Sequence, residues 1–173
     1  MAAFEFSGIN HLALVCKDMD RTIDFYTNVL GMPLTKTIDL PGNRGKHYFF
    51  DCGGGDQIAF FWFPDGPDSV SEKELRRVSA IPGTMNHLAF NVAPDKIDEY
   101  RERLVSMDID VTEVVNHDDS DKQVSEDISP STFVRSIYFK DPDGMQLEFA
   151  AWARELTAGD VNYTPPADSV AAG

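Results

Sequence analysis

Two nearly identical six-residue segments place a histidine in the same position. INHLAL runs from residue 9 to 14 and MNHLAF from residue 85 to 90, so the histidines are His11 and His87. A histidine that occurs once is more often structural, whereas a histidine that recurs in the same local context indicates a shared role. Imidazole nitrogen is the commonest protein ligand of transition metals. The repeat therefore indicates one site to which both segments contribute.

A carboxylate in a third segment extends this pattern. In MQLEFAA, side chains alternate across a strand, so Glu148 faces one side while Leu147 and Phe149 face the other. An unpaired charge in a packed core is costly, whereas a cation beside it removes that cost. Two histidines and one glutamate with open positions are typical of a metal site. Pairing of Glu148 with an arginine such as Arg135 is the alternative interpretation.

Charge and composition exclude several classes of partner. The chain of 173 residues is 42% hydrophobic and 25% charged, with a formal net charge of −14. Such a charge repels phosphates, so we expect neither nucleic acid nor an anionic membrane as a partner. No apolar run approaches the length of about 20 residues that a membrane span needs. The absence of a secretory signal and the two cysteines, Cys16 and Cys52, favour a reduced cytoplasmic protein.

Each histidine segment is followed by the same succession of elements. Apolar residues at helical spacing follow both segments, and Gly31 is a helix-stop residue after the first helix. Asp18 and Asp95 occupy the positions expected for helix N-caps. The apolar residues at helical spacing are Ile23, Tyr26 and Leu30 in the first copy and Ile97, Tyr100 and Leu104 in the second.

Strand-like segments complete each copy, so both halves have the order β-α-β-β-β. We predict an α+β protein with a first module at 5–63, a linker at 64–83, a second module at 84–153 and a tail at 154–173. SEKELRRV predicts a short helix in the linker, and the polar segment 116–132 predicts a surface loop or lid. The expected strand segments are PLTKTIDL, GKHYFFDC and QIAFFWF in the first module and DVTEVVN, FVRSIYF and MQLEFAAW in the second.

Four segments resemble the vicinal oxygen chelate superfamily, which includes glyoxalase I, bleomycin resistance proteins and extradiol dioxygenases. They are INHLAL, FYTNVLGM, MNHLAF and YFKDPDGMQLEF. The resemblance implies two βαβββ modules whose sheets curve around a metal, and a small-molecule substrate that chelates it through neighbouring oxygens. His11, His87 and Glu148 match metal-ligand positions. Because related proteins are often dimers, it also implies a homodimer.

The first module departs from glyoxalase I at its last strand. There the family has another ligand glutamate, but matching GDQIAFF to GMQLEFA places Ala59 opposite Glu148 and Gln57 opposite Gln146. Alanine cannot bind a metal. We therefore expect Gln57 to contact the substrate or to support the metal ligands.

The remaining ligand set favours an oxygenase. Two histidines and one carboxylate are typical of non-haem Fe(II) enzymes, and the last motif resembles the extradiol dioxygenase signature, with Tyr138 at its tyrosine position. That branch also has an acid–base histidine about seven residues before the tyrosine, which this chain lacks. The candidates to replace it are His117, which would otherwise be a solvated loop residue, His47 and Tyr48. Phe61 and Phe133 are candidates for an apolar pocket wall.

The leading hypothesis is a small extradiol-type dioxygenase that acts on a catechol-like substrate. Fe(II) is the favoured metal, with Mn(II), Ni(II) and Zn(II) as alternatives. Two other functions stay open. One is a lyase, isomerase or epimerase that stabilises an enediolate, and the other is a metal-free binding protein of the bleomycin-resistance type.

Overall fold

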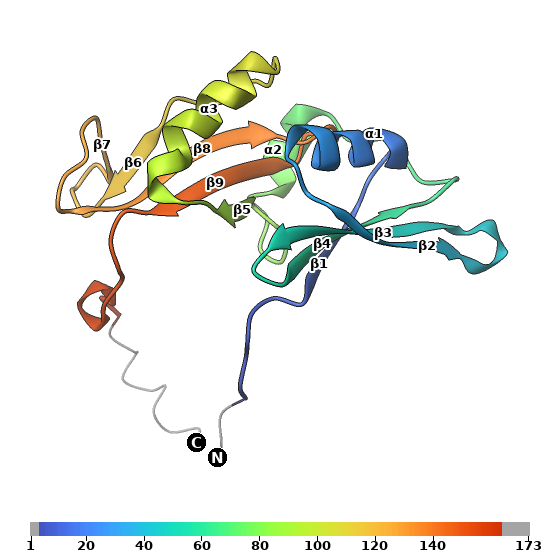
Figure 1. The fold of residues 1–173 in the computed structure, drawn as a ribbon, viewed down its shortest axis with the longest axis horizontal. Coiled ribbons are helices and arrows are strands. Elements are labelled where there is room, and N and C mark those ends of the chain that lie inside the picture. The colour runs from blue at the N-terminus through green and yellow to red at the C-terminus, as the bar shows by residue number, and fades with distance from the viewer. Residues whose placement is uncertain (1–3, 164–173) are drawn as a thin grey trace.

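The computed structural model describes residues 4–163, which form two mixed sheets (Figure 1). The first sheet has the order β1-β4-β3-β2 and the second β5-β9-β8-β6-β7. In each sheet the histidine segment leads into an edge strand that pairs in parallel with the last long strand of its module. The predicted α+β class with one sheet from each half of the chain is therefore confirmed. The first sheet contains β1 (His11–Val15), β2 (Leu34–Leu40), β3 (Gly45–Gly53) and β4 (Asp56–Trp62).

The helix of the first module begins where its sequence predicts. α1 (Met19–Asp24) is capped by Asp18, whose carboxylate accepts a hydrogen bond from the backbone N of Arg21 at 3.0 Å. The helix continues as a π-helical turn, η1 (Phe25–Val29), and the chain leaves it at Gly31 with φ of +77°. This left-handed conformation suits glycine. The predicted cap and stop are thus confirmed.

The second module differs from its prediction at two points. α3 (Ile97–Ser106) begins after a 3-10 turn, η3 (Pro94–Lys96), so Asp95 lies inside that turn and does not cap the helix. The strand predicted over 110–116 begins only at β6 (Val115–Asp118). Before it, Val111 and Val114 pack against the apolar core, and the backbone N of Thr112 donates to the carbonyl of Tyr138 at 3.0 Å. The other strands of the second sheet are β5 (Leu88–Asn91), β7 (Val124–Ser125), β8 (Thr132–Lys140) and β9 (Gln146–Trp152).

The segment 116–132 is more regular than the expected loop. Its first residues belong to β6, which forms a hairpin with β7. The side-chain amide of Asn116 donates to the carbonyls of Ser125 and Glu126 at 3.2 and 3.0 Å and so ties the two ends of the hairpin together. His117 therefore lies in a strand of the second sheet.

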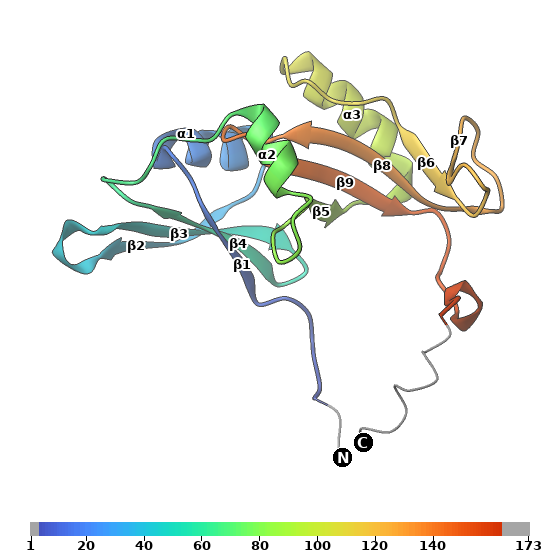
Figure 2. The same ribbon diagram turned by 180° about the vertical axis from the view of Figure 1, so that it is seen from behind.

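The linker contains the predicted helix. α2 (Glu72–Val78) is capped by Ser71, whose hydroxyl accepts from the backbone N of Glu74 at 3.3 Å. It packs near the junction of the two sheets, as Figure 2 shows. Short 3-10 turns occur at η2 (Pro41–Asn43) and η4 (Ala158–Asp160). The last ten residues of the predicted tail, 164–173, lie outside the described residues.

One apolar core lies on the helix side of both sheets. Tyr26, Phe60 and Leu147 are at most 1% exposed and belong to the same cluster of buried side chains. α1 and α3 lie over the same side of their sheets, and the opposite faces are left uncovered (Figures 1 and 2). No helix between residues 4 and 163 has the length and apolar character that crossing a membrane requires.

A buried carboxylate connects the two modules. Oδ1 of Asp141 accepts from the backbone N of Asp143 at 3.0 Å and of Met145 at 2.8 Å, and the hydroxyl of Tyr26 donates to Oδ2 at 3.4 Å. Asp141 is only 7% exposed. Burial raises its pKa to about 6, and the nearby charge of Asp143 also raises it, while the backbone hydrogen bonds lower it in part.

This carboxylate predicts a pH-dependent stability. The pKa of Asp141 is higher in the folded state than in the unfolded chain. Its contribution to the free energy of unfolding is therefore complete below about pH 4 and is lost as pH rises through about 6. We expect Asp141→Asn, which keeps the Oδ1 acceptor, to remove this loss, worth roughly 2 to 3 kcal/mol. Urea unfolding at pH 4 and 7.5 measures it. Asp39→Asn, at an exposed position in β2, is the control. An unchanged difference between the two pH values in Asp141→Asn would contradict the interpretation.

Candidate metal centre

A buried carboxylate and a histidine meet on the open face of the second sheet. Glu148 Oε2 lies 2.8 Å from His87 Nε2, and Glu148 is 5% exposed. In register, Glu148 of β9 lies between Ala89 of β5 and Tyr138 of β8. The small side chain of Ala89 leaves space beside the carboxylate. The structure therefore brings together two of the three predicted ligands.

Each histidine is oriented by the asparagine that precedes it. His11 Nδ1 lies 2.7 Å from Asn10 Oδ1, and His87 Nδ1 lies 2.7 Å from Asn86 Oδ1. An amide oxygen only accepts, so a proton is assigned to Nδ1, and in the neutral imidazole Nε2 then has the free lone pair. This support of a histidine by an outer hydrogen bond is common among metal ligands. Sequence reasoning missed it, although the repeated Asn-His dipeptide was its visible sign.

The contact between His87 and Glu148 suits either a proton or a metal cation. With the proton on Nδ1, the lone pair of His87 Nε2 faces a carboxylate oxygen of Glu148 at 2.8 Å. Two acceptors at this distance repel each other unless a proton or a metal cation lies between or beside them. Imidazole and carboxylate together suit Fe(II), Mn(II), Ni(II) and Zn(II). The donor set thus fits a divalent metal.

The linker supports this orientation. The side-chain amide of Asn86 donates to the carbonyl of Ser79 at 3.2 Å, just after α2. The same side chain therefore contacts His87 through its oxygen and the linker through its nitrogen. This gives α2 a positioning role at the site.

His11 lies on the open face of the first sheet, beside Gln57. The two are register partners in β1 and β4, and Gln57 Oε1 accepts from the hydroxyl of Thr35 at 2.7 Å. Ala59 follows on the same face and is fully buried. No carboxylate takes the place of a second glutamate at this position.

His47 and Phe61 form an aromatic wall on the same face. Their rings stack with centroids 3.6 Å apart and planes 10° apart, and His47 also contacts Phe49 at 4.4 Å. Burial lowers the pKa of His47, and the charge of His11 lowers it further. His47 is therefore neutral more readily than an exposed histidine.

Tyr138 and His117 form a hydrogen-bonded pair next to Glu148. The hydroxyl of Tyr138 lies 3.0 Å from His117 Nε2. Burial raises the pKa of Tyr138, and the charge of Glu148 raises it further. Phe133 borders the pair, with its ring centroid 6.4 Å from that of His117.

Tyr48 lies on the other side of its sheet. It is the register partner of Phe60 in the buried row of β4 and packs against the core, while His47 before it faces the open side. Strand alternation already places adjacent residues on opposite faces, so His47 and Tyr48 could not both face the site. Of the candidate acid–base residues, the structure brings His117, Tyr138 and His47 to the open faces.

His11 does not meet the other two ligands within one chain. Among the residues from 4 to 163, no three histidine, cysteine, aspartate or glutamate side chains are close enough to bind one metal ion. One chain therefore presents the pair His87–Glu148 on its second sheet and His11 separately on its first.

The family model of the Glyoxalase/Bleomycin resistance protein/Dioxygenase superfamily matches residues 8–149. The chain belongs to this superfamily. The matched range includes both histidine segments, the linker and the strand of Glu148.

Two relatives are similar to most of the chain. Metallothiol transferase FosB of Lysinibacillus sphaericus is 30% identical over 142 residues, which is 82% of this chain and 80% of the relative. Fosfomycin resistance protein FosX of Listeria monocytogenes is 26% identical over 152 residues, 86% of this chain and 92% of the relative. The crystal structure of that FosX with Mn(II) and sulfate superposes with a TM-score of 0.55 at 24% identity, covering 85% of this chain and 93% of that one.

The asparagine next to His87 provides a test of the site. Asn86→Ala removes the acceptor that orients Nδ1, and we expect Mn(II) affinity to fall by about 10- to 100-fold. Titration calorimetry measures the affinity. Asn91→Ala, which removes an amide from β5 without contact to either histidine, should bind Mn(II) as the wild type does. Equal affinity of Asn86→Ala and the wild type would rule out the orienting role.

Proposed function

We propose that the protein is a metal-dependent enzyme whose site binds a divalent cation through His11, His87 and Glu148. The observation that supports this most directly is the buried Glu148 carboxylate, which faces His87 Nε2 at 2.8 Å while Asn86 holds Nδ1. The matching Asn10–His11 pair on the first sheet supports His11 as the third ligand. A cation there would supply Lewis acidity and bind a substrate through two adjacent oxygens.

The site is completed by a second copy of the chain. The two sheets of one chain share a core on their helix sides, and their open faces point away from that core (Figure 1). A twofold dimer would put the first sheet of one copy against the second sheet of its partner and create two equal sites. Each site would combine His11 of one copy with His87 and Glu148 of the other.

Side chains of the open faces have distinct roles in this site. Tyr138, kept protonated at neutral pH, donates a hydrogen bond to a substrate oxygen that gains negative charge, and His117 orients its hydroxyl. The stack of His47 and Phe61 forms an apolar wall that excludes water. Gln57, held by Thr35, keeps its amide nitrogen for a substrate oxygen.

The reaction that we favour is a transfer of a thiol to a substrate with adjacent oxygens. The name of FosB, a metallothiol transferase, supports it, and the Mn(II) in the crystal structure of FosX makes Mn(II) the metal to test first. An extradiol dioxygenase with Fe(II) is the second candidate, because two histidines with one carboxylate form the ligand set of such enzymes. The close contact of His117 and Tyr138 favours this candidate too, since it supplies an acid–base pair.

A glyoxalase I reaction is disfavoured by the first module. In that reaction a carboxylate of the first module would take a proton from the substrate, in addition to Glu148, which the proposed site uses as a metal ligand. Ala59 offers none, and the oxygen of Gln57 already accepts a hydrogen bond from Thr35.

Mixing two inactive variants tests the shared site. His11→Ala and His87→Ala should each lose bound Mn(II). When the two are unfolded and refolded together, about half of the dimers are mixed and each has one intact site, so about a quarter of the wild-type metal content should return. Elemental analysis after gel filtration measures it.

A matched pair of variants controls the mixing experiment. His87→Ala and Glu148→Gln alter the same half of the site, so their mixture should recover no metal. If His11→Ala with His87→Ala recovers none either, the site does not combine two copies in the proposed way.

A comparison of three reactions tests the chemistry. With Mn(II), we expect loss of free thiol when cysteine is incubated with fosfomycin, and no such loss in Glu148→Gln. The methylglyoxal–glutathione adduct should be inert with any metal, and turnover on the order of ~10 per second would contradict the role given to Ala59. Oxygen uptake with catechol only in the Fe(II)-loaded protein would replace the transferase by the dioxygenase.

A further inference from the structure

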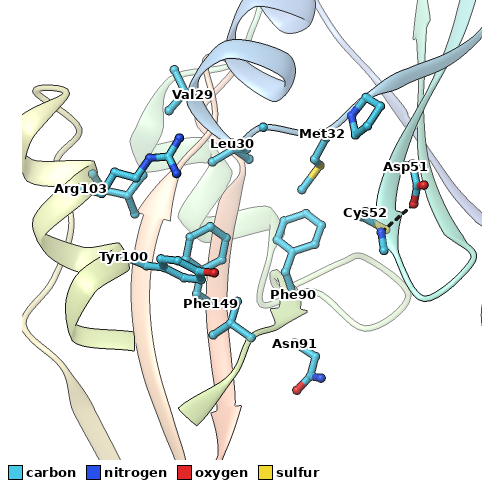
Figure 3. A pocket seen from close by; sticks show the side chains of 15 residues that line it. Val29, Leu30, Met32, Asp51, Cys52, Phe90, Asn91, Tyr100, Arg103 and Phe149 are labelled. Atoms are coloured by element: carbon cyan, nitrogen blue, oxygen red, sulfur yellow. Dashed lines mark hydrogen bonds between the residues drawn. The ribbon is translucent and has the colours of Figure 1, made fainter. Parts of the chain in front are cut away.

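A second cavity lies between the two modules of one chain. Its volume is about 380 Å³, within the range of small-molecule pockets. The first module contributes Leu30 and Met32 from the segment between η1 and β2, and Figure 3 shows them across from the rings of Phe90 and Phe149. The part of its wall that these residues form is therefore apolar and aromatic.

This cavity lies on the other side of the sheet from the metal ligands. Phe149 follows Glu148 directly in β9, and alternation along the strand directs the two side chains to opposite faces. Both walls of the cavity come from one chain. It is thus separate from the proposed metal centre and does not depend on a second copy.

Two hydrogen-bond donors border the apolar wall. Tyr100 and Arg103 lie three residues apart on one face of α3, and both line the cavity. In Figure 3 the guanidinium of Arg103 is directed towards Leu30. Within residues 4–163, Arg103 forms no ion pair and the hydroxyl of Tyr100 forms no hydrogen bond, whereas the neighbouring Arg101 pairs with Glu113.

Asp51 also borders this cavity, but its side chain belongs to the open face of β3. It is the register partner of Gln57, and its Oδ1 accepts from the backbone N of Gly53 at 2.7 Å. The charge next to the apolar wall is therefore that of Arg103.

We propose that this cavity binds a small apolar monocarboxylate. The carboxylate of the ligand accepts hydrogen bonds from the guanidinium of Arg103 and the hydroxyl of Tyr100, and its apolar body packs against Phe90, Phe149 and Met32. A planar guanidinium matches a carboxylate with two parallel hydrogen bonds. Because the ligand would contact both modules, its binding also stabilises their packing.

Calorimetry with 3-phenylpropionate tests the site, with 3-phenylpropan-1-ol as the probe that has the same apolar body without the charge. The full-length protein is titrated with and without Mn(II). We expect the acid to bind at least about tenfold more tightly than the alcohol, equally in both forms, and to raise the melting temperature. Binding of the acid that requires Mn(II) would assign it to the metal centre and overturn the proposal.

Matched arginine variants locate the binding. Arg103→Gln should weaken binding of the acid by about 10- to 100-fold and leave the alcohol unchanged. Arg101→Gln removes the same charge from the same helix, but outside the cavity, and should bind the acid as the wild type does. Tyr100→Phe should weaken it several-fold. Two results would overturn the proposal. One is that the acid binds Arg103→Gln as tightly as the wild type, and the other is that the wild type binds the acid and the alcohol equally well.

Discussion

The contact between Glu148 and His87 is the constraint on which the arrangement of the open face depends. A carboxylate that is 95% covered by protein is costly unless a positive charge lies beside it. A proton on His87 Nε2 or a metal cation beside the pair supplies that charge, while Asn86 holds the other ring nitrogen, Nδ1. The neighbouring features follow from this need: the small Ala89 leaves space, and the end of α2 fixes Asn86.

Strand alternation lets the same strands stabilise the fold and build the site. In β9, Leu147 and Phe149 belong to the apolar core, and Glu148 between them faces the open side. In β4, Phe60 packs against Tyr26, while Gln57 and Phe61 on the opposite face are the register partners of His11 and His47. Stability and chemistry therefore use opposite faces, and a substitution on the open face leaves the packing under the helices largely intact.

The duplication of the module explains both the proposed dimer and the second cavity. Two similar modules in one chain pack through their helix sides, and this junction is not filled completely, which leaves the cavity bordered by Arg103. The same junction turns the open faces away from each other, which is why the proposed site takes the first histidine and the carboxylate from two copies. Closed twofold symmetry would cover both open faces at once.

The sequence by itself determined what depends on local geometry: the two modules, the cap at Asp18, and the strand faces of the histidines and of Glu148. These follow from the periods of helices and strands, which are properties of the backbone. Only the tertiary structure decided that Glu148 meets His87 and not His11 of the same chain, that His117 reaches Tyr138, and that a cavity opens beside α3. These features depend on how the sheets pack against each other, which is set by contacts between residues distant in the chain and leaves no periodic pattern in the sequence.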